Sequence, residues 1–315
     1  MKIVVTGGNG FIGQHIVKEL ASRGFEVISF DLVTPAEIVD GVKYLIGTVM
    51  DTFTMCKIFK GCDAVFHLAA ILGVKRADSQ LLRCLTINIE GTKNVLEAAV
   101  MSGVPYVFLT SSSEIFGDVN MEKVGEKDQF NPKSGYAISK LAAESYLKGF
   151  NAEYDLEFNI VRFFNIYGPG QVAEFVVPRF IKMAQNGIAP KIYGEGNQIR
   201  SFCHISDAAR AAVDVFQDKR GRNETYNIGN DLEPITIRDL ATKVIKTVGA
   251  DLEPVFVPFE ESDRKDSREI FFRIPEISKI KRFINYSPQI MLDEGLQDVM
   301  ENGEIPESWV EPYEI

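Results

Sequence analysis

The chain of 315 residues is 45% hydrophobic and 25% charged, which is ordinary for a globular enzyme and long enough for two lobes. Its formal net charge is -10 and it has no Lys/Arg-rich run, so no nucleic-acid partner is expected, because duplex binding needs a clustered cationic face. The four cysteines form no CxxC pair and the three histidines are scattered, which predicts reduced thiols and no metal site. Ile3 follows the first residues without space for a signal peptide, and no apolar stretch reaches the length of a bilayer span. We therefore expect a cytoplasmic protein with no membrane partner.

Short apolar runs alternate with helical patterns through the first half of the chain. Strands that alternate with helices predict an α/β fold with a doubly wound parallel sheet. Parallel strands are covered on both faces, which explains why the apolar runs are continuous. The strands are predicted over residues 3–6, 26–30, 64–68, 106–109 and 158–161, and the helices over residues 12–22, 89–100 and 138–150.

After about residue 165 the alternation loosens and Gly and Pro become frequent. We expect residues 1–167 to form a first domain, to which residues 199–229 return. Residues 168–315 are expected to form mainly a smaller C-terminal lobe that binds substrate, with a cleft between the two parts. Helices are predicted in this half over residues 176–185, 206–216, 237–248 and 275–283.

A glycine string joins the first predicted strand to the first predicted helix. Gly7, Gly10 and Gly13 fit GxxGxxG, and Gly8 with the last two also fits GxGxxG. Such a turn lets the backbone approach a pyrophosphate, and the following helix N-terminus offers N–H groups to it. Because the string lies between a strand and a helix, it predicts a dinucleotide-binding site of Rossmann type.

Asp31 follows 18 residues after Gly13, at the end of the second predicted strand. A carboxylate at this place binds the hydroxyls of the adenosine ribose. No Arg or Lys occurs between Asp31 and Lys43 to hold a 2'-phosphate. The sequence therefore favours NAD over NADP.

Tyr136 and Lys140 are separated by one helical turn and share a face of the predicted helix. A phenol has an ordinary pKa of about 10, and a nearby ammonium favours its phenolate. The pair is therefore a candidate general base for an alcohol that loses a hydride.

A polar run from Thr110 to Glu114 follows the strand predicted over 106–109. Open α/β sheets bind their ligands at this carboxyl end of the strands. If the strand continues, its period of two places Thr110, Ser112 and Glu114 on one face. Ser112 could then hydrogen-bond the hydroxyl that Tyr136 deprotonates. Glu114 is either a carboxylate at the reaction centre or a structural or solvated side chain.

These segments together resemble an extended short-chain dehydrogenase/reductase, the family of NAD-dependent sugar-nucleotide epimerases, dehydratases and decarboxylases. The resemblance covers residues 1 to about 230 in order, and it is specific for the family but not for the substrate. The matching pieces are TGGNGFIG, Asp31, HLAA (67–70), Asn88, SSSEIFG (111–117), YAISK (136–140), RFFNIYGPG (162–170), IRSFCHISDAA (199–209) and YNIG (226–229).

The resemblance implies a role for each matching residue. Tyr136 would be the base, Lys140 would lower its pKa and bind the ribose, Ser112 would complete the triad, and Glu114 is the further catalytic candidate. A guanidinium suits a diphosphate, which implies that role for Arg200. The implied NAD contacts are Gly7, Gly10, Phe11, Ile12, Asp31, Thr48, Val49, Leu68, Ala69, Ala70, Asn88, Thr110, Tyr136, Lys140 and Phe163. The implied substrate contacts are Ser112, Asn165, Phe175, Val176, Tyr193, Arg200 and Arg264. Related proteins also dimerise, which implies a homodimer through helices 89–100 and 138–150.

Three positions depart from the family pattern. Thr48 stands where an adenine-contacting Asp is usual, with only Asp51 following. Ser201 replaces the usual acidic residue after the phosphate-binding arginine. The C-terminal arginine motif is irregular over residues 262–268, and the second arginine that contacts the diphosphate is assigned there to Arg264, with Arg268 as the alternative.

The resemblance implies that the first step gives a 4-keto sugar by hydride transfer from C4 to NAD. Epimerisation at C4 is favoured, because it is frequent in the family. A 4,6-dehydratase or a decarboxylase that uses Glu114 stays open, although dehydratases carry an Asp where this chain has Ser113. A 4-dehydrogenase that releases the keto sugar and a non-catalytic NAD-binding sensor are further alternatives.

Overall fold

Seven parallel strands form the central sheet, in the order β11-β6-β5-β4-β1-β2-β3. The computed structural model describes residues 1–72, 79–119, 123–259 and 270–307. The order extends outward from β1 in both directions, so the predicted Rossmann-type doubly wound fold is confirmed. The strands are β1 (Lys2–Thr6), β2 (Glu26–Asp31), β3 (Lys43–Ile46), β4 (Ala64–His67), β5 (Tyr106–Ser112), β6 (Glu157–Phe163) and β11 (Glu224–Ile228).

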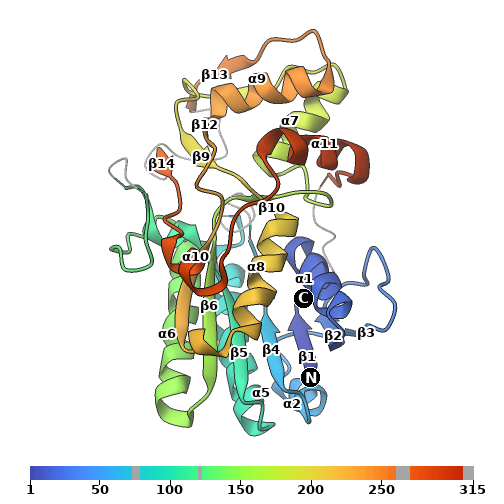
Figure 1. Ribbon diagram of the computed structural model, residues 1–315, viewed down its shortest axis with the longest axis vertical. Coiled ribbons are helices and arrows are strands. Elements are labelled where there is room, and N and C mark those ends of the chain that lie inside the picture. The colour runs from blue at the N-terminus through green and yellow to red at the C-terminus, as the bar shows by residue number, and fades with distance from the viewer. Residues whose placement is uncertain (73–78, 120–122, 260–269, 308–315) are drawn as a thin grey trace.

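Helices cover both faces of this sheet (Figure 1). Successive side chains of a strand point to opposite faces, so Ile3 and Val5 pack into one core while Val4 packs into the other. Both faces are therefore apolar, as the continuous runs predicted. The first core is covered by α1 (Phe11–Ser22), α8 (Ile205–Gln217) and α10 (Ser278–Ile284), and the second by α2 (Thr52–Phe59), α5 (Gly91–Met101) and α6 (Gly135–Tyr154).

A smaller group of elements lies beyond the carboxyl ends of the strands, at the top of Figure 1. Its helices share a third apolar core. Its largest sheet has three strands in the order β12-β9-β14, and β13 pairs with β8. The elements are α7 (Val176–Gln185), α9 (Ile237–Val248), α11 (Leu292–Asn302), β8 (Lys191–Tyr193), β9 (Ile199–Ser201), β12 (Pro234–Thr236), β13 (Val255–Val257) and β14 (Phe272–Arg273).

Short elements connect these parts. Two-residue strands pair in parallel between the sheet and the smaller group, and α4 leads through a π-helical turn into α5. No helix in the described part of the chain has the length and apolarity needed to cross a bilayer. The short elements are α4 (Leu81–Leu85), η1 (Thr86–Glu90), η2 (Ser113–Phe116), β7 (Ile166–Tyr167), β10 (Cys203–His204) and η3 (Lys219–Gly221).

Two local predictions were wrong. The helix predicted over 275–283 begins only at Ser278, because Pro275 forms a parallel bridge with Val124 and the segment before the helix is extended. Strand β5 ends at Ser112, and a 3-10 turn follows over Ser113–Phe116. Glu114 is therefore not presented by strand alternation with Thr110 and Ser112.

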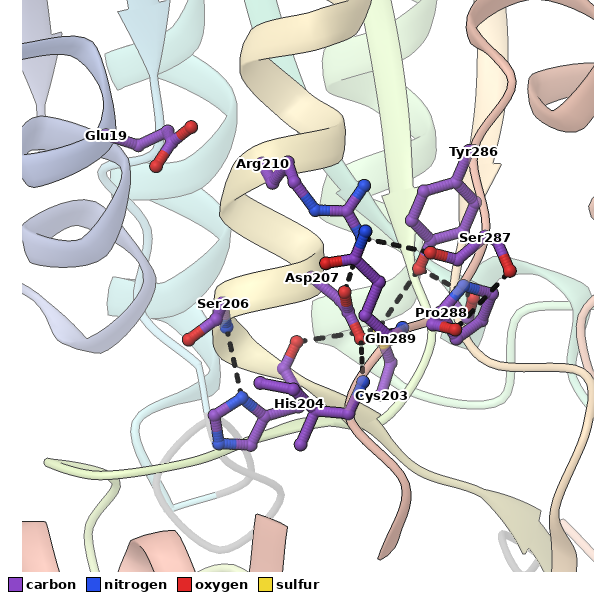
Figure 2. Close-up of polar contacts among 12 residues, drawn as sticks. Glu19, Cys203, His204, Ser206, Asp207, Arg210, Tyr286, Ser287, Pro288 and Gln289 are labelled. Atoms are coloured by element: carbon purple, nitrogen blue, oxygen red, sulfur yellow. Dashed lines mark hydrogen bonds and ion pairs between the residues drawn. The ribbon is translucent and has the colours of Figure 1, made fainter. Parts of the chain in front are cut away.

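A buried polar cluster anchors the chain where it leaves the sheet for α11 (Figure 2). Asp207, on α8 and 2% exposed, accepts hydrogen bonds at Oδ2 from the backbone N–H groups of Gln289 (2.8 Å) and Ile290 (3.0 Å). Arg210 pairs with the other oxygen of Asp207 and donates to the carbonyl of Ser287 at 2.9 Å. The cluster thus holds the segment 287–290 against α8.

Candidate active site

One cavity of about 1710 Å³ opens at the carboxyl ends of the central strands and extends beneath the smaller group of elements. A pocket for one small ligand typically measures roughly 300–1,000 Å³. The cavity therefore has room for a dinucleotide and a second ligand side by side.

The glycine turn forms one end of this cavity. Gly7 has a positive φ of 71°, and a Cβ there would lie 2.6 Å from the backbone nitrogen of Ala69. A Cβ at Gly13 would collide with the carbonyl oxygen of Gly7. Gly10 precedes α1, whose first turn has no acidic residue and no side-chain cap. The backbone can thus approach a pyrophosphate, and the N-terminus of α1 is available to stabilise its charge.

Asp31 ends β2 and lines the same part of the cavity. Its carboxylate accepts hydrogen bonds from the backbone N–H groups of Asn9 (2.9 Å) and Leu32 (2.6 Å). Burial raises the pKa of Asp31, and these backbone N–H groups oppose the rise. Asp51, by contrast, caps α2 by accepting from the N–H of Thr54 at 3.0 Å.

Almost all the implied NAD contacts line this cavity. Asn88 is the exception among them: it is 2% exposed, and its amide exchanges hydrogen bonds with the backbone of Ile71 and donates to Ser139 Oγ at 3.0 Å. It holds the segment after β4 against α6 from behind the cavity wall. The residues in the lining are Gly7, Gly10, Phe11, Ile12, Asp31, Thr48, Val49, Leu68, Ala69, Ala70, Thr110, Tyr136, Lys140 and Phe163.

Tyr136 and Lys140 line the cavity from the first turns of α6. Lys140 is 6% exposed, and its Nζ donates to the carbonyl of Thr110 at 3.0 Å and lies 5.9 Å from the centre of the Tyr136 ring. Burial lowers the pKa of Lys140 to about 8, so it still carries its charge near neutral pH.

The predicted lowering of the Tyr136 pKa is not found in the protein alone. Burial and then the nearby Glu114 carboxylate raise this pKa, and only a hydrogen bond with Ser112 opposes them. Removing a phenolate from water costs more than this one hydrogen bond returns. Tyr136 is therefore a hydrogen-bonded neutral phenol before ligands bind.

Glu114 lies beside this pair, and a buried arginine faces it. Arg273 Nη1 is 3.9 Å from Glu114 Oε1 and donates to Ser113 Oγ at 3.3 Å. Ser134, the N-cap of α6, donates to the other oxygen of Glu114 at 3.3 Å. Arg273 is 5% exposed and lines the cavity. The reaction centre thus combines a phenol, an ammonium, a carboxylate and a guanidinium.

The far part of the cavity contains the implied substrate contacts. Arg200 lies on β9 directly beside Arg273 on β14, so two guanidinium groups come from adjacent strands. Asn165 donates from its amide to the carbonyl of Ser201 at 3.0 Å. Arg264 and Arg268 lie outside the described residues. The residues predicted to contact the substrate that line the cavity are Ser112, Asn165, Phe175, Val176, Tyr193 and Arg200.

Comparison with known proteins agrees with this geometry. The model of the NAD dependent epimerase/dehydratase family matches residues 3–229. The chain belongs to this family. It is 32% identical over 315 residues to the UDP-N-acetyl-alpha-D-glucosaminuronate decarboxylase of Bacillus cytotoxicus, covering 95% of this chain and 97% of that one.

Solved structures show the same likeness. The UDP-glucose 4-epimerase of Thermotoga maritima with UDP-glucose has a TM-score of 0.88 and 30% identity, covering 96% of this chain and 98% of that chain. MoeE5 in complex with UDP-glucuronic acid and NAD has a TM-score of 0.87 and 28% identity, with the same coverage. This family member is therefore an NAD-dependent enzyme, and a purely non-catalytic sensor is set aside.

The sequence missed two polar residues of the enzyme's cavity. Arg273 interrupts the apolar run 270–274, and a lone arginine in such a run indicates a buried charge with a partner. Gln198 is 5% exposed and lines the cavity, and its amide oxygen has no hydrogen-bond partner among the described residues. A buried polar atom of this kind indicates a ligand or water contact.

Proposed function

We propose that the enzyme converts a nucleoside-diphosphate uronic acid through a 4-keto sugar, with decarboxylation as the overall reaction. The observation that carries this proposal is the Glu114–Arg273 pair, which lies in the cavity beside Tyr136 and Ser112. The sugar ring of a neutral hexose carries no anionic group for a buried guanidinium beside Glu114. The C6 carboxylate of a uronic acid does, because arginine binds a carboxylate through its planar fork of donors.

Oxidation at C4 is the first step. Tyr136 would first lose its own proton to solvent as the ligands bind, and its phenolate oxygen would then take the proton of the C4 hydroxyl while Ser112 hydrogen-bonds the C4 oxygen. Lys140 is the nearby cation that favours the phenolate at that moment. The glycine turn and Asp31 would hold NAD, which would supply the hydride acceptor for C4 and the hydride that reduces it again.

The ketone at C4 makes the C6 carboxylate a β-keto acid. The C5–C6 bond breaks, carbon dioxide leaves, and the electron pair passes to O4 as an enolate. The Tyr136 hydroxyl would donate a hydrogen bond to that developing charge. Arg273 would bind the C6 carboxylate before decarboxylation. The Glu114 carboxylate would balance the positive charge of the guanidinium after carbon dioxide has left. C5 then takes a proton from solvent and the C4 ketone is reduced again, so hydrogen replaces the carboxylate and the sugar loses only carbon dioxide.

Epimerisation at C4 is the second candidate, and it uses the same first step. It is supported by the likeness to a UDP-glucose 4-epimerase over almost the whole chain. A 4,6-dehydratase fits less well. Ser113, which stands where dehydratases carry an Asp, accepts a hydrogen bond from Arg273 and has no carboxyl proton to give to a leaving hydroxyl.

Incubation with UDP-glucuronic acid, UDP-N-acetylglucosaminuronic acid and UDP-glucose tests the proposal. Decarboxylation predicts carbon dioxide and a pentose-type product from a uronic acid, with no net NADH, as measured by NMR and mass spectrometry. A C4-inverted product of unchanged mass would instead establish the epimerase. Stoichiometric NADH with a keto product would establish the 4-dehydrogenase.

The same proposal divides the chain by role. Residues 1–167, together with 199–229, would hold NAD, and residues 168–315 would mainly hold the nucleotide sugar. In support, α8 and β11, both within 199–229, belong to the central sheet layers. Strand β9 (Ile199–Ser201) with Arg200 departs from this division, because it lies in the smaller sheet. A cytoplasmic location is proposed with it, because the four cysteines are free thiols, three of them buried, as a reducing compartment allows.

We also propose a homodimer through α5 and α6. Met101 on α5 is 74% exposed, and Ile138 and Tyr146 on α6 are 50% and 38% exposed, which leaves apolar surface on both helices. Tyr146→Glu would place a charge in that surface, so we expect it to shift the protein from dimer to monomer in light scattering after gel filtration. A monomeric wild type, or a dimer that Tyr146→Glu leaves intact, would contradict this interface.

A further inference from the structure

A buried ion pair lies behind the reaction centre, outside the cavity. Arg162 on β6 and Glu144 on α6 are each 1% exposed. Arg162 donates from Nε to Glu144 Oε1 at 2.9 Å and from Nη2 to Oε2 at 2.7 Å. This two-pronged geometry fixes the plane of the guanidinium as well as its position.

The same guanidinium contacts two further segments. Its Nη1 donates to the backbone carbonyl of Glu126 at 2.8 Å. Its central carbon lies 5.1 Å from the ring centre of Phe116 and 4.8 Å from that of Phe130. Arg162 therefore joins three separate parts of the chain through one planar group.

Two of these parts lie next to Glu114 and Arg273. Phe116 ends the 3-10 turn that contains Glu114. The segment before Glu126 holds the backbone next to Arg273, because Val124 donates to the carbonyl of Ile274 at 2.8 Å and accepts from the N–H of Glu276 at 2.8 Å.

The third part is the rigid one. Glu144 lies one helical turn beyond Lys140 on α6, which also carries Tyr136. Ser134 caps this helix by accepting from the N–H of Ala137 at 3.1 Å, and Lys140 ties it to β5. Helix α6 is thus held without Arg162, whereas the turn with Glu114 and the strand with Arg273 are short elements that Arg162 connects to it.

We propose that Arg162 is a positioning residue that sets Glu114 and Arg273 relative to Tyr136. Arg162 would act in the step after C4 oxidation, when Glu114 and Arg273 must keep their positions next to the keto sugar until turnover is complete. The inference rests on the roles proposed above for Glu114 and Arg273. Neither Arg162 nor Glu144 is among the residues implied to contact NAD.

The variant Arg162→Lys tests it. The ammonium keeps the positive charge opposite Glu144, but it cannot bind both carboxylate oxygens and reach the Glu126 carbonyl as well. With the substrate that the wild type turns over, we expect an unchanged rate of C4 oxidation, measured as NADH absorbance in a single turnover. The fraction of turnovers that release the 4-keto sugar with NADH should rise about tenfold or more, since small misplacements of reacting groups cost that much. A crystal structure should show a changed Glu114–Arg273 separation and an unchanged Tyr136–Lys140 pair.

Arg210→Lys is the matched control. It weakens another arginine–carboxylate pair, that of the partly exposed Arg210 with the buried Asp207 in Figure 2, which does not touch the cavity. It should lower the melting temperature without changing the fraction of keto sugar released. If Arg162→Lys does not fold, Phe116→Leu removes the aromatic ring beside the guanidinium, keeps an apolar side chain in the core, and should shift the same fraction in the same direction.

Equal slowing of both steps, or an unchanged fraction of keto sugar released, would overturn the proposal. Failure of the proposed function is a separate outcome. If the wild type epimerises a sugar and never releases carbon dioxide, decarboxylation is excluded, and the released fraction measured on that sugar still decides the role of Arg162.

Discussion

Tyr136→Phe is expected to lower kcat by about 10²- to 10⁴-fold, the usual contribution of a positioned acid–base group. Tyr136 lines the cavity, and its phenol group is hydrogen-bonded to Ser112 and lies beside the buried ammonium of Lys140. Without the phenol oxygen, no group takes the proton of the C4 hydroxyl. The ring itself stays, so the affinity for NAD and for UDP should not change. The measurement is single-turnover NADH formation together with calorimetric binding of each ligand.

Tyr154→Phe is the matched control for this variant. Tyr154 is on the same helix, at its last residue, and is 55% exposed. Removing its hydroxyl should leave both kcat and binding unchanged. A Tyr136→Phe enzyme that keeps most of its kcat would show that another group is the base.

Arg273→Gln is expected to stop the reaction of a uronic acid after C4 oxidation. The amide keeps a hydrogen-bond donor for Ser113 but loses the charge that would hold the C6 carboxylate. Loss of one such preorganised contact costs about 10²- to 10³-fold in kcat. We therefore expect the first NADH signal to persist, carbon dioxide release to fall by that factor, and the 4-keto sugar to appear in the medium. Glu114→Gln should give the same pattern if the carboxylate acts with Arg273.

A comparison of substrates separates two roles of Arg273. Because it lies beside Arg200, it could instead bind the diphosphate. In that case Arg273→Gln would raise the KM for UDP-glucose and UDP-glucuronic acid alike. Contact with the carboxylate predicts an effect on the uronic acid alone. Arg238→Gln is the control, since Arg238 lies on α9 and pairs with the carbonyl of Glu195 outside the cavity.

Patterns of neighbouring residues in the sequence were sufficient to predict most of the fold and the parts of the candidate site near the glycine turn and α6. The glycine turn, Asp31 and the Tyr136–Lys140 spacing each depend on a few consecutive residues and one neighbouring element. A turn that only glycine can adopt, or two side chains one helical turn apart, is specified by the chain itself. The alternation of strands and helices specified the doubly wound sheet in the same way.

The Glu114–Arg273 contact is different, because 159 residues separate its partners in the chain. The sequence pointed to Arg264 or Arg268 for the second arginine near the substrate, after Arg200, and it placed Glu114 beside Ser112 on the condition that the strand continues. In the fold, a 3-10 turn redirects Glu114, and the bridge between Val124 and Pro275 brings the segment of Arg273 to it.

The sequence by itself therefore determined the glycine turn, the helix that carries Tyr136 and Lys140, and the family. Only the tertiary structure decided which arginine faces Glu114, that Asn88 lies behind the cavity wall, and that burial raises the pKa of Tyr136. The physical reason is that spacing along a helix or turn is set by backbone geometry, whereas pairing of buried charges and their desolvation depend on which distant segments pack together.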